Sequence, residues 1–273
     1  MKTNRIAILG AGNIGTAIAN GLVESGRFDV ADITLTRRKV TKLDGMKKKG
    51  FVIQTNNCEA VKEADVIIIA VEPLQVDGLL EEVASYLEPD RHIIISVVTG
   101  MSRATILRRI GAEVPVVRAM PNTAISVRES MTCLASDDAG DAVDVARSIF
   151  DTVGTTLLLD EEQMVAATAV GACGIAFFLR AIRAASQGGI EVGLHSGDAL
   201  ALAAQTARGA ATLLVDLGYH PEGEIDKVTT PRGCTIAGLN QMEHDGFSSA
   251  MIRGIAVSAE RAAKLYSDNE KDE

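Results

Sequence analysis

Short apolar runs alternate with amphipathic stretches over residues 6–159. Residues 65–71 and 92–97 are nearly unbroken runs of β-branched and aliphatic side chains, which is typical of parallel strands covered on both faces. Elsewhere, apolar side chains recur at helical spacing, as at Ile14, Ile18 and Leu22. This alternation predicts an α/β fold built on a doubly wound, Rossmann-type sheet.

The boundaries of these elements follow from the same pattern. Glu72 and Pro73 end the fourth run, and Pro73 favours the start of a helix. The predicted strands cover residues 6–9, 33–36, 51–54, 65–71, 92–97, 114–118, 131–135 and 155–159. The predicted helices extend from the first glycine loop to near Gly26, over 39–49, to near Glu63, over 74–87 and over 138–150.

From Glu161 onward the pattern predicts helices alone, so we divide the chain into domains 1–160 and 161–273. Helices are predicted over 162–187, 198–217 and 247–266, with Gly218 and Pro221 as a helix stop. We expect the acidic tail 268–273 to fray. Alanine-rich, aromatic-poor helices bury little surface alone, so we expect an all-α dimerisation domain completed by a second copy, as a homodimer or higher homo-oligomer.

The first strand enters the sequence Gly10-Ala11-Gly12-Asn13-Ile14-Gly15 and then a helix. In a GxGxxG loop, the first glycine permits the tight turn, the second brings the backbone close to a pyrophosphate, and the third packs the helix on the strand. The helix N-terminus then offers N–H groups to phosphate. We therefore predict a dinucleotide site in which Gly10, Gly12, Asn13, Ile14 and Gly15 bind the cofactor.

The residues that distinguish NADPH from NADH are expected at the end of the second strand, where Thr36 is followed by Arg37 and Arg38. An NAD-specific fold usually places Asp or Glu here for the ribose 2′-hydroxyl, whereas a 2′-phosphate favours arginine. Guanidinium groups bind phosphate through charge-assisted hydrogen bonds. We therefore favour NADPH, with NADH as the alternative.

Ligands of open α/β sheets bind at the carboxyl ends of the strands. Two loops at such ends, residues 70–73 and 97–100, lie where they could contact a nicotinamide. From the first we take Ala70, Val71 and Pro73 as cofactor-binding candidates.

A second loop, residues 228–238, resembles a helix entry. Thr230 and Pro231 give an extended approach, Gly233 lets the chain turn, and the N–H groups of Gly233, Cys234 and Thr235 would be unpaired at the helix start. Such N–H groups would hold a small carboxylate. The alternative is that Thr230 or Thr235 only caps the helix.

Composition and charge exclude several classes of protein. With 47% hydrophobic and 23% charged residues, the 273-residue chain has the composition of an ordinary globular protein. Its longest uncharged run, residues 163–179, is shorter than the ~20 residues of a membrane span, so we expect a buried helix and no membrane partner. Scattered cysteines predict neither disulfides nor a metal site, and the early first strand argues against secretion, so we expect a cytoplasmic protein.

The net charge of −9 is unevenly distributed. Residues 1–50 contain ten basic and four acidic residues, so the basic excess lies on the predicted nucleotide domain while the remainder is acidic. This distribution fits a small polyanionic ligand better than nucleic acid.

At this point the chain resembles pyrroline-5-carboxylate reductase along nearly its whole length. The resemblance rests on GAGNIG at 10–15, RAMPN at 118–122, AAQTARGA at 203–210 and HPEGEIDKVTTPRGCTIAGL at 220–239. It implies that NAD(P)H delivers a hydride to the imine carbon of 1-pyrroline-5-carboxylate, giving L-proline, and that the helical domain dimerises to build the substrate site.

The resemblance also assigns residues. It implies that the N–H groups of Gly233, Cys234 and Thr235 bind the substrate carboxylate, with the Thr235 hydroxyl near the ring nitrogen and Thr230 beside it. We name Thr235 as the catalytic candidate. In the RAMPN motif, we add Met120, Pro121 and Asn122 to the cofactor-binding candidates.

Three positions depart from the family pattern. Glu72 stands where the family commonly has lysine, so a cationic role there is absent. Gly171-Ala172-Cys173-Gly174 replaces the usual Gly-Ser-Gly-Pro, which removes a hydroxyl and a proline from the first long helix. Arg232 replaces a glycine, and its side chain either leans toward the substrate carboxylate or reaches solvent.

The chemistry expected of such a site needs no titrating side chain. A threonine hydroxyl is too weak an acid to protonate an amine at neutral pH, so the imine is expected to bind protonated or to take its proton from water. Two alternatives stay open at this point. A β-hydroxyacid dehydrogenase would need a lysine on the first long helix, which residues 162–187 lack, and a non-catalytic NADPH-binding dimer would explain Glu72 and Cys173.

Overall fold

The computed structural model describes residues 5–137 and 140–271. By the contacts among its residues, the chain divides into two compact units. Unit 1 is Met1–Cys173 together with Ser258–Glu273, and unit 2 is Gly174–Val257. The domain boundary predicted between residues 160 and 161 falls inside unit 1 and stays a prediction.

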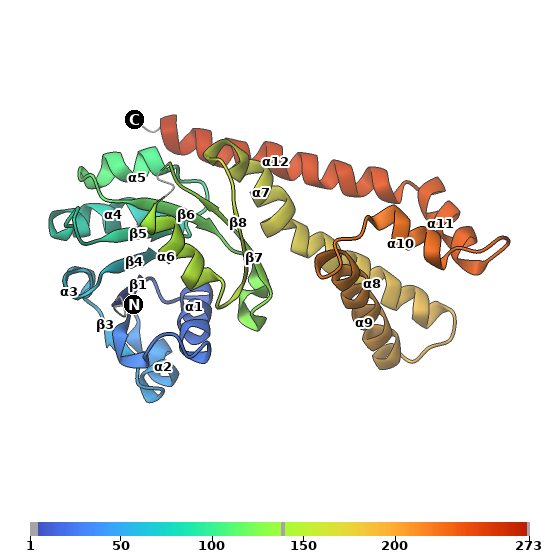
Figure 1. The fold of residues 1–273 in the computed structure, drawn as a ribbon, viewed down its shortest axis with the longest axis horizontal. Helices are drawn as coiled ribbons and strands as arrows, with labels where there is room; N and C mark the ends of the chain where they lie inside the picture. The colour runs from blue at the N-terminus through green and yellow to red at the C-terminus, as the bar shows by residue number, and fades with distance from the viewer. Residues whose placement is uncertain (1–4, 138–139, 272–273) are drawn as a thin grey trace. The chain divides into compact units, whose positions relative to one another are not determined.

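Unit 1 is built on an eight-stranded sheet of order β3-β2-β1-β4-β5-β6-β7-β8 (Figure 1). The first six strands are parallel, whereas β7 is antiparallel to β6 and β8 is parallel to β7. The order of these six strands is that of a Rossmann fold, so the predicted α/β class is confirmed. The strands are β1 (Ile6–Leu9), β2 (Ile33–Thr36), β3 (Val52–Gln54), β4 (Val66–Ile69), β5 (Ile93–Ser96), β6 (Val116–Met120), β7 (Ser130–Ala135) and β8 (Gly154–Leu158).

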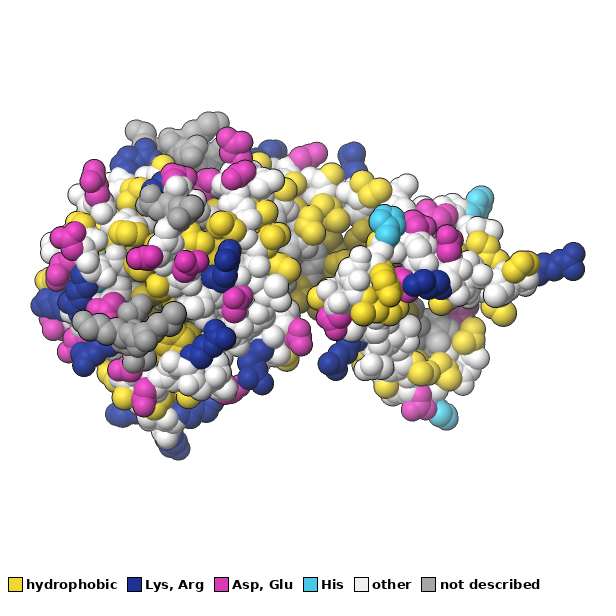
Figure 2. Space-filling model, in the orientation of Figure 1, with side chains coloured by type: hydrophobic (Ala, Val, Ile, Leu, Met, Phe, Trp, Pro, Cys, Tyr) yellow, Lys and Arg dark blue, Asp and Glu magenta, His cyan; other side chains and the backbone are white. Residues whose placement is uncertain are grey.

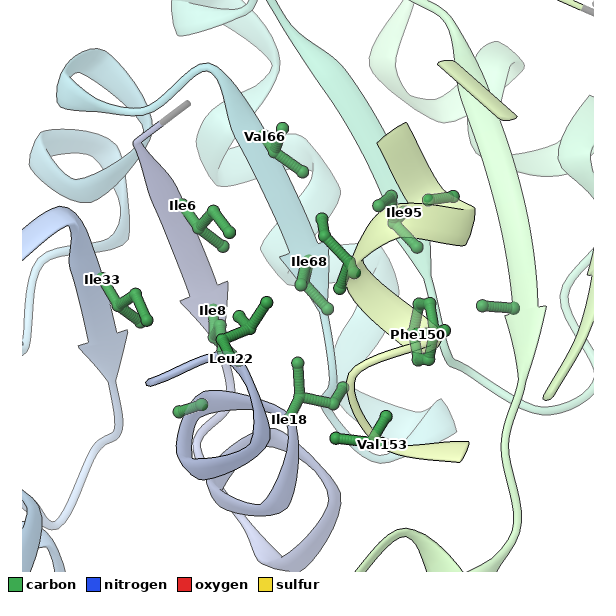
Figure 3. Packing of buried hydrophobic residues seen from close by; sticks show 14 of the residues in the cluster. Ile6, Ile8, Ile18, Leu22, Ile33, Val66, Ile68, Ile95, Phe150 and Val153 are labelled. Atoms are coloured by element: carbon green, nitrogen blue, oxygen red, sulfur yellow. The ribbon is translucent and has the colours of Figure 1, made fainter. Parts of the chain in front are cut away.

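The central strands are covered by helices on both faces, which explains their unbroken apolar sequences. Ile6 and Ile8 of β1 face one hydrophobic cluster, which contains side chains of α1 (Asn13–Glu24) and α6 (Asp141–Phe150). Figure 3 shows these isoleucines beside Ile18, Leu22 and Phe150. Ala7 and Leu9 point to the opposite cluster, formed with α3 (Asn57–Glu63), α4 (Pro73–Val83) and α5 (Arg103–Ile110). The alternation of side chains along each strand therefore builds two cores around one sheet.

Three helical segments of unit 1 differ from the prediction. The helix expected at 39–49 is a 3₁₀ turn, Val40–Leu43, followed by α2 (Asp44–Lys48). The helix expected at 138–150 begins at Asp141, and residues 138–139 lie outside the described residues. The sequence analysis missed α5, although the Ser102 side chain caps its start and Gly111 ends it in the left-handed conformation.

The predicted first long helix is interrupted at its centre. It comprises a 3₁₀ turn (Glu161–Gln163), α7 (Met164–Ala167), a π-helical turn (Thr168–Cys173) and α8 (Gly174–Glu191). The π-helical turn is the last segment of unit 1 before the chain enters unit 2. Other short 3₁₀ helices lie at Val30–Asp32, Ala84–Tyr86 and Thr123–Val127.

Unit 2 continues from α8 through α9 (Ser196–Val215), α10 (Pro221–Val228) and α11 (Cys234–His244) to the first part of α12 (Phe247–Lys271). The predicted helix stop at Gly218 and Pro221 is confirmed, because α9 ends at Val215 and Gly218 has a left-handed φ of +65°. Pro221 is also the first residue of α10, where its missing N–H costs nothing, and the sequence analysis missed this short helix. The helix α12 extends to Lys271, and the fraying expected of the tail 268–273 stays a prediction. Residues 272–273 lie outside the described residues.

Unit 2 leaves most of its apolar side chains exposed. Buried positions are confined to Gly174, Ser186 and Ala199, while Phe178 and Leu202 are 63% and 56% exposed. Figure 2 shows hydrophobic side chains spread over the visible surface of this unit. The expectation of a buried helix at 163–179 holds only in part, because Met164, Ala167 and Ala169 are buried whereas Val170, Phe178 and Leu179 are more than half exposed. By length and composition, Glu161–Glu191 is apolar enough to cross a membrane, and only 17% of its most apolar window is buried.

Candidate active site

The three glycines of the first loop meet three different surroundings. Gly10 has φ +96°, and a Cβ there would lie 2.6 Å from Val71 Cγ1 and 2.7 Å from the Ala70 oxygen. A Cβ on Gly15 would lie 2.9 Å from the Gly10 oxygen and 3.0 Å from Ile8 Cγ2. A Cβ on Gly12 would meet no atom within 4 Å. The first and third glycines are thus required by protein packing, whereas Gly12 faces open space, as a phosphate-binding loop requires.

The loop leads into a helix start without a side-chain cap. Gly12 is the N-cap of α1, and Asn13, Ile14 and Gly15 form its first turn, with no acidic residue in it. The loop is held to the sheet instead, because Gly10 and Ala11 donate their N–H groups to the Thr36 oxygen at 3.2 and 2.8 Å. An uncapped helix N-terminus beside an open glycine is a favourable place for an anion.

The carboxyl ends of the central strands are aligned beside this loop. Leu9 of β1 pairs with Ile69 of β4, and Ile69 pairs with Ser96 of β5. The predicted residues Ala70, Val71 and Pro73 follow β4 directly, and Pro73 is the first residue of α4. The alignment brings two of the predicted loops, 10–15 and 70–73, to one edge of the sheet.

Arg37 and Arg38 differ in their surroundings at the end of β2. Arg37 is half-buried and donates from Nη1 to the Ala11 oxygen at 3.0 Å, so its guanidinium lies against the glycine loop. Arg38 is exposed. One arginine is therefore held at the loop while the other is exposed to solvent, and both carry the positive charge that a 2′-phosphate requires.

The side chain of Thr36, which we count with Arg37 and Arg38 among the predicted cofactor-binding residues, is hydrogen-bonded within the protein. It is 2% exposed, and its hydroxyl donates to Asn57 Oδ1 at 2.7 Å. Asn57 Nδ2 donates in turn to Glu82 Oε2 at 3.0 Å. The sequence analysis missed Asn57 and Glu82, because only the sheet brings residues of α3 and α4 next to β2. The Cys58 thiol also contacts Glu82, and burial, reinforced by that carboxylate, raises the pKa of Cys58, which keeps the thiol protonated.

Met120, Pro121 and Asn122 complete the same edge of the sheet at the end of β6. Met120 is buried in a small cluster with Met164 and Ala167. The Asn122 side chain accepts from the Ala124 N–H at 3.0 Å and donates from Nδ2 to the Gly171 oxygen at 3.1 Å. The amide therefore makes contacts within the protein on both sides.

The second predicted loop lies in unit 2, between α10 and α11. Gly233 is the N-cap of α11, which starts at Cys234 without a side-chain cap, so neither Thr230 nor Thr235 caps it. A Cβ on Gly233 would lie 2.5 Å from Thr230 Oγ1, which explains the glycine. The Gly233 N–H donates to the Thr230 oxygen at 2.9 Å, so in this conformation the free donors of the loop are those of Cys234 and Thr235 rather than all three.

The positions that depart from the family pattern are also located. Arg232 is exposed with φ +62°, the third position of the turn closed by Gly233 and Thr230, where glycine is favoured. Glu72 is the N-cap residue of α4 and accepts from Gln75 Nε2 at 3.2 Å. Cys173 is half-buried at the end of the π-helical turn. Among residues 5–137 and 140–271, no cluster of three or more metal-ligating side chains is present.

Comparisons with known proteins agree on one family. Residues 161–265 match the family model described as pyrroline-5-carboxylate reductase dimerisation, and residues 5–100 match that described as NADP oxidoreductase, coenzyme F420-dependent. The chain is 52% identical to pyrroline-5-carboxylate reductase 1 of Dictyostelium discoideum over 98% of its own length and 51% of that protein, so it spans about half of this relative.

Two further proteins are similar over nearly their whole length. Pyrroline-5-carboxylate reductase 2 of Dictyostelium discoideum is 47% identical, with 97% of this chain and 94% of that protein covered. The solved structure of a pyrroline-5-carboxylate reductase from Coxiella burnetii is 29% identical, with a TM-score of 0.91 and 97% and 99% of the two chains covered.

Proposed function

Because this chain belongs to the pyrroline-5-carboxylate reductase family, we propose that it reduces 1-pyrroline-5-carboxylate to L-proline with NADPH. The observation that carries the proposal is the pair of uncapped helix starts, at Gly12 in unit 1 and at Gly233 in unit 2. Each offers backbone N–H groups to an anion, the first to a pyrophosphate and the second to a carboxylate.

The residues of unit 1 fit a dinucleotide. When bound, NADPH supplies the hydride for the imine carbon. The open space at Gly12 admits the pyrophosphate, and the N–H groups of Asn13 and Ile14 at the start of α1 would hold it. Arg37, held against Ala11, and the exposed Arg38 would bind the 2′-phosphate, which favours NADPH over NADH.

The residues of the second loop fit the substrate. The N–H groups of Cys234 and Thr235 would bind its carboxylate, and the Thr235 hydroxyl would orient the ring nitrogen, with Thr230 beside it. Anchoring the carboxylate fixes the imine carbon, and such positioning can supply about 7–11 kcal/mol of barrier lowering. The nitrogen takes its proton from water or binds already protonated, since a threonine hydroxyl is too weak an acid at neutral pH.

The enzyme works as a homo-oligomer in this proposal, at least a dimer. Phe178 of α8 and Leu202 of α9 are more than half exposed, and the matched family model is that of the dimerisation domain. A second copy of unit 2 is the partner whose apolar surface would complement these helices.

The test is to incubate the protein with NADPH and 1-pyrroline-5-carboxylate and to follow the absorbance of the reduced nicotinamide together with proline formation. We expect both NADPH consumption and proline. Binding of NADPH without its consumption would indicate a non-catalytic dimer, and reduction of NADP⁺ by a β-hydroxyacid would indicate the dehydrogenase alternative. Either result would refute the proposal.

The role of Thr235 is tested by Thr235→Ala. We expect kcat to fall substantially while the Kd for NADPH stays unchanged, because the hydroxyl orients the substrate and does not contact the cofactor. Thr212→Ala is the matched control, since the Thr212 hydroxyl donates to the Arg208 oxygen within α9. Full activity of Thr235→Ala would reject the role.

A further inference from the structure

Asn122 uses all its polar groups to join three segments of unit 1. Its backbone N–H donates to Ser130 Oγ of β7 at 3.1 Å, and its carbonyl accepts from the Ile125 N–H at 3.1 Å. Its side chain caps the 3₁₀ helix Thr123–Val127 through the Ala124 N–H and donates to the Gly171 oxygen. The residue thus ties the end of β6 to its own loop, to β7 and to the first long helix.

The orientation of the Asn122 amide is fixed by chemistry on both sides. The Ala124 N–H can only donate and the Gly171 carbonyl can only accept, so Oδ1 must face Ala124 and Nδ2 must face Gly171. If the amide were flipped by 180°, neither partner would be hydrogen-bonded. This side chain is therefore not available to turn its donor toward a ligand without losing the contact with Gly171.

The carbonyl that Asn122 contacts lies in the π-helical turn Thr168–Cys173. Single π-helical turns interrupt the regular i→i−4 ladder of a helix and occur frequently at functional sites. The Asn122 amide gives this turn a hydrogen bond from outside the helix. Asn122 is thus placed to fix the π-helical turn that separates α7 from α8.

Two more contacts hold the same helix on the same strand. Arg118 of β6, which is 2% exposed, forms an ion pair with Glu161 at 2.6 Å between Nη1 and Oε1. Between this ion pair and the amide contact, Met120 packs with Met164 and Ala167. Three residues of the RAMPN motif, Arg118, Met120 and Asn122, therefore support residues 161–173.

We propose that Asn122 is a positioning residue, whose amide holds the π-helical turn beside the strand ends where the nicotinamide is proposed to bind. The inference rests on the proposed function, because it assigns the RAMPN motif a purpose in that reaction. Pro121 and Asn122 follow β6 at the same sheet edge as 70–73 follow β4, since Ile69 pairs with Ser96 and Ser96 pairs with Arg118. If the π-helical turn moved, the surface beside the ends of β4, β5 and β6 would change shape, while the loop 10–15 and Arg37 would stay in place.

The test separates the Gly171 contact from the cap. Asn122→Asp keeps an oxygen for the Ala124 N–H but places a carboxylate against the Gly171 carbonyl, and Asn122→Ser keeps a capping hydroxyl and loses the long donor. We expect kcat to fall about 10- to 100-fold in both, because small displacements at a reacting centre have effects of this size. The Kd for NADPH should change by less than about threefold, because in this inference the Asn122 amide is bonded to Ala124 and Gly171 and does not bind the cofactor, unlike in the expectation from the sequence. The primary isotope effect with NADPH deuterated at the transferred position should increase.

A second readout does not depend on turnover. Amide hydrogen exchange of a peptide covering residues 165–176 should be faster in Asn122→Asp than in the unaltered protein, because the π-helical turn has lost its outside donor. Ser126→Ala is the matched control: its hydroxyl donates to the Thr123 oxygen in the same 3₁₀ helix, so neither kcat nor this exchange should change.

The possible outcomes are distinct. A kcat within about twofold of the unaltered protein in both variants overturns the inference, whether or not exchange accelerates. A lower kcat with unchanged exchange also overturns it, because the effect then does not act through the π-helical turn. If the unaltered protein forms no proline, the proposed function fails, and the exchange measurement still decides whether Asn122 holds the turn.

Discussion

Unit 1 buries its apolar side chains inside itself, whereas unit 2 leaves its own on the surface. The sheet of unit 1 carries a closed cluster on each face, and Ile8 and Ile67 are fully buried. In unit 2, Phe178 and Leu202 are mostly exposed although they lie within long helices. The difference teaches that the sheet of unit 1 forms its core within one chain, whereas the exposed apolar side chains of unit 2 fit the dimerisation model that residues 161–265 match.

Charges introduced on the exposed apolar side chains of α8 and α9 test this difference between the two units most directly. Phe178→Glu combined with Leu202→Glu should dissociate the oligomer, because burial of two such side chains contributes roughly 3–6 kcal/mol, or more than about 100-fold in the dissociation constant. Sedimentation velocity measures the result. Leu74→Glu is the matched control, since Leu74 is equally apolar and fully exposed but lies in unit 1. An unchanged oligomer in the double variant would contradict the assignment of this surface.

Within unit 1, two glycines of one loop distinguish packing from ligand binding. Gly10→Ala should lower the free energy of unfolding by about 1–3 kcal/mol, because a Cβ there meets Val71 and the Ala70 carbonyl at a positive φ. Gly12→Ala should leave stability nearly unchanged and raise the Kd for NADPH about tenfold or more, since its Cβ meets only the space where the pyrophosphate is proposed to bind. Thermal unfolding and NADPH titration measure the two effects. Equal loss of stability in both variants would mean that Gly12 also has a packing role.

The basic residues at 37 and 38 sharpen the choice of cofactor. Arg37→Ala with Arg38→Ala should lower the ratio of kcat/KM for NADPH over NADH about 10- to 100-fold, because charge-assisted hydrogen bonds to the 2′-phosphate are lost. Arg37→Ala alone should also weaken NADH binding, since Arg37 contacts Ala11 in the glycine loop. Lys39→Ala, which removes the same charge from an exposed neighbouring position, serves as the control. An unchanged ratio in the double variant would reject both arginines as determinants.

The smallest expected effect concerns the buried His92 at the start of β5. Burial, followed by the charge of Arg91, lowers the pKa of His92 from its ordinary value of 6.5. Above pH 6.5 both the folded and the unfolded states are neutral at this residue; as pH falls below 6.5, the unfolded state gains a proton first and unit 1 loses stability. The free energy of unfolding should fall by at most about 1.4 kcal/mol for each pH unit, the limit for one proton taken up on unfolding.

This pH dependence is measured by urea unfolding at several pH values. His92→Gln, which retains a side-chain acceptor for the Glu88 N–H, should show a smaller loss of stability between pH 7 and pH 5. The same acid-induced loss in the variant would mean that another group is responsible.

The elements that sequence could predict are those whose evidence is local. The strands at 65–71 and 92–97 are apolar because they are covered on both faces, and this pattern is visible in the chain itself. The helix α5 was missed because it is short and three of its eight residues are arginines, Arg103, Arg108 and Arg109, so its clearest marks are the caps at Ser102 and Gly111. Pro221 marks the stop after α9 correctly, but α10 was missed because proline both follows helices and starts them.

For the candidate site, the sequence predicted residue types and the structure supplied their partners. Gly12 and Arg37 could be named from spacing alone, whereas the contact of Thr36 with Asn57 depends on the pairing of distant segments. The contact of Asn122 with Gly171 spans 49 positions, so no local pattern reports it. The sequence predicted that the second loop has free N–H groups. It could not predict that the Gly233 N–H is used in the turn, where it donates to the Thr230 oxygen.

The helix α12 has a consequence for biosynthesis. Residues Phe247–Val257 belong to unit 2, but Ser258–Glu273 belongs to unit 1, so the chain leaves unit 1 at Cys173 and returns to it within one continuous helix. A ribosome therefore synthesises all of unit 2 before it synthesises the last segment of unit 1. The nucleotide-binding part can collapse early around its sheet, but its final helical segment is added only after the helical unit has emerged. Translation thus gives this chain an order of assembly in which the first unit begun is also the last to be completed.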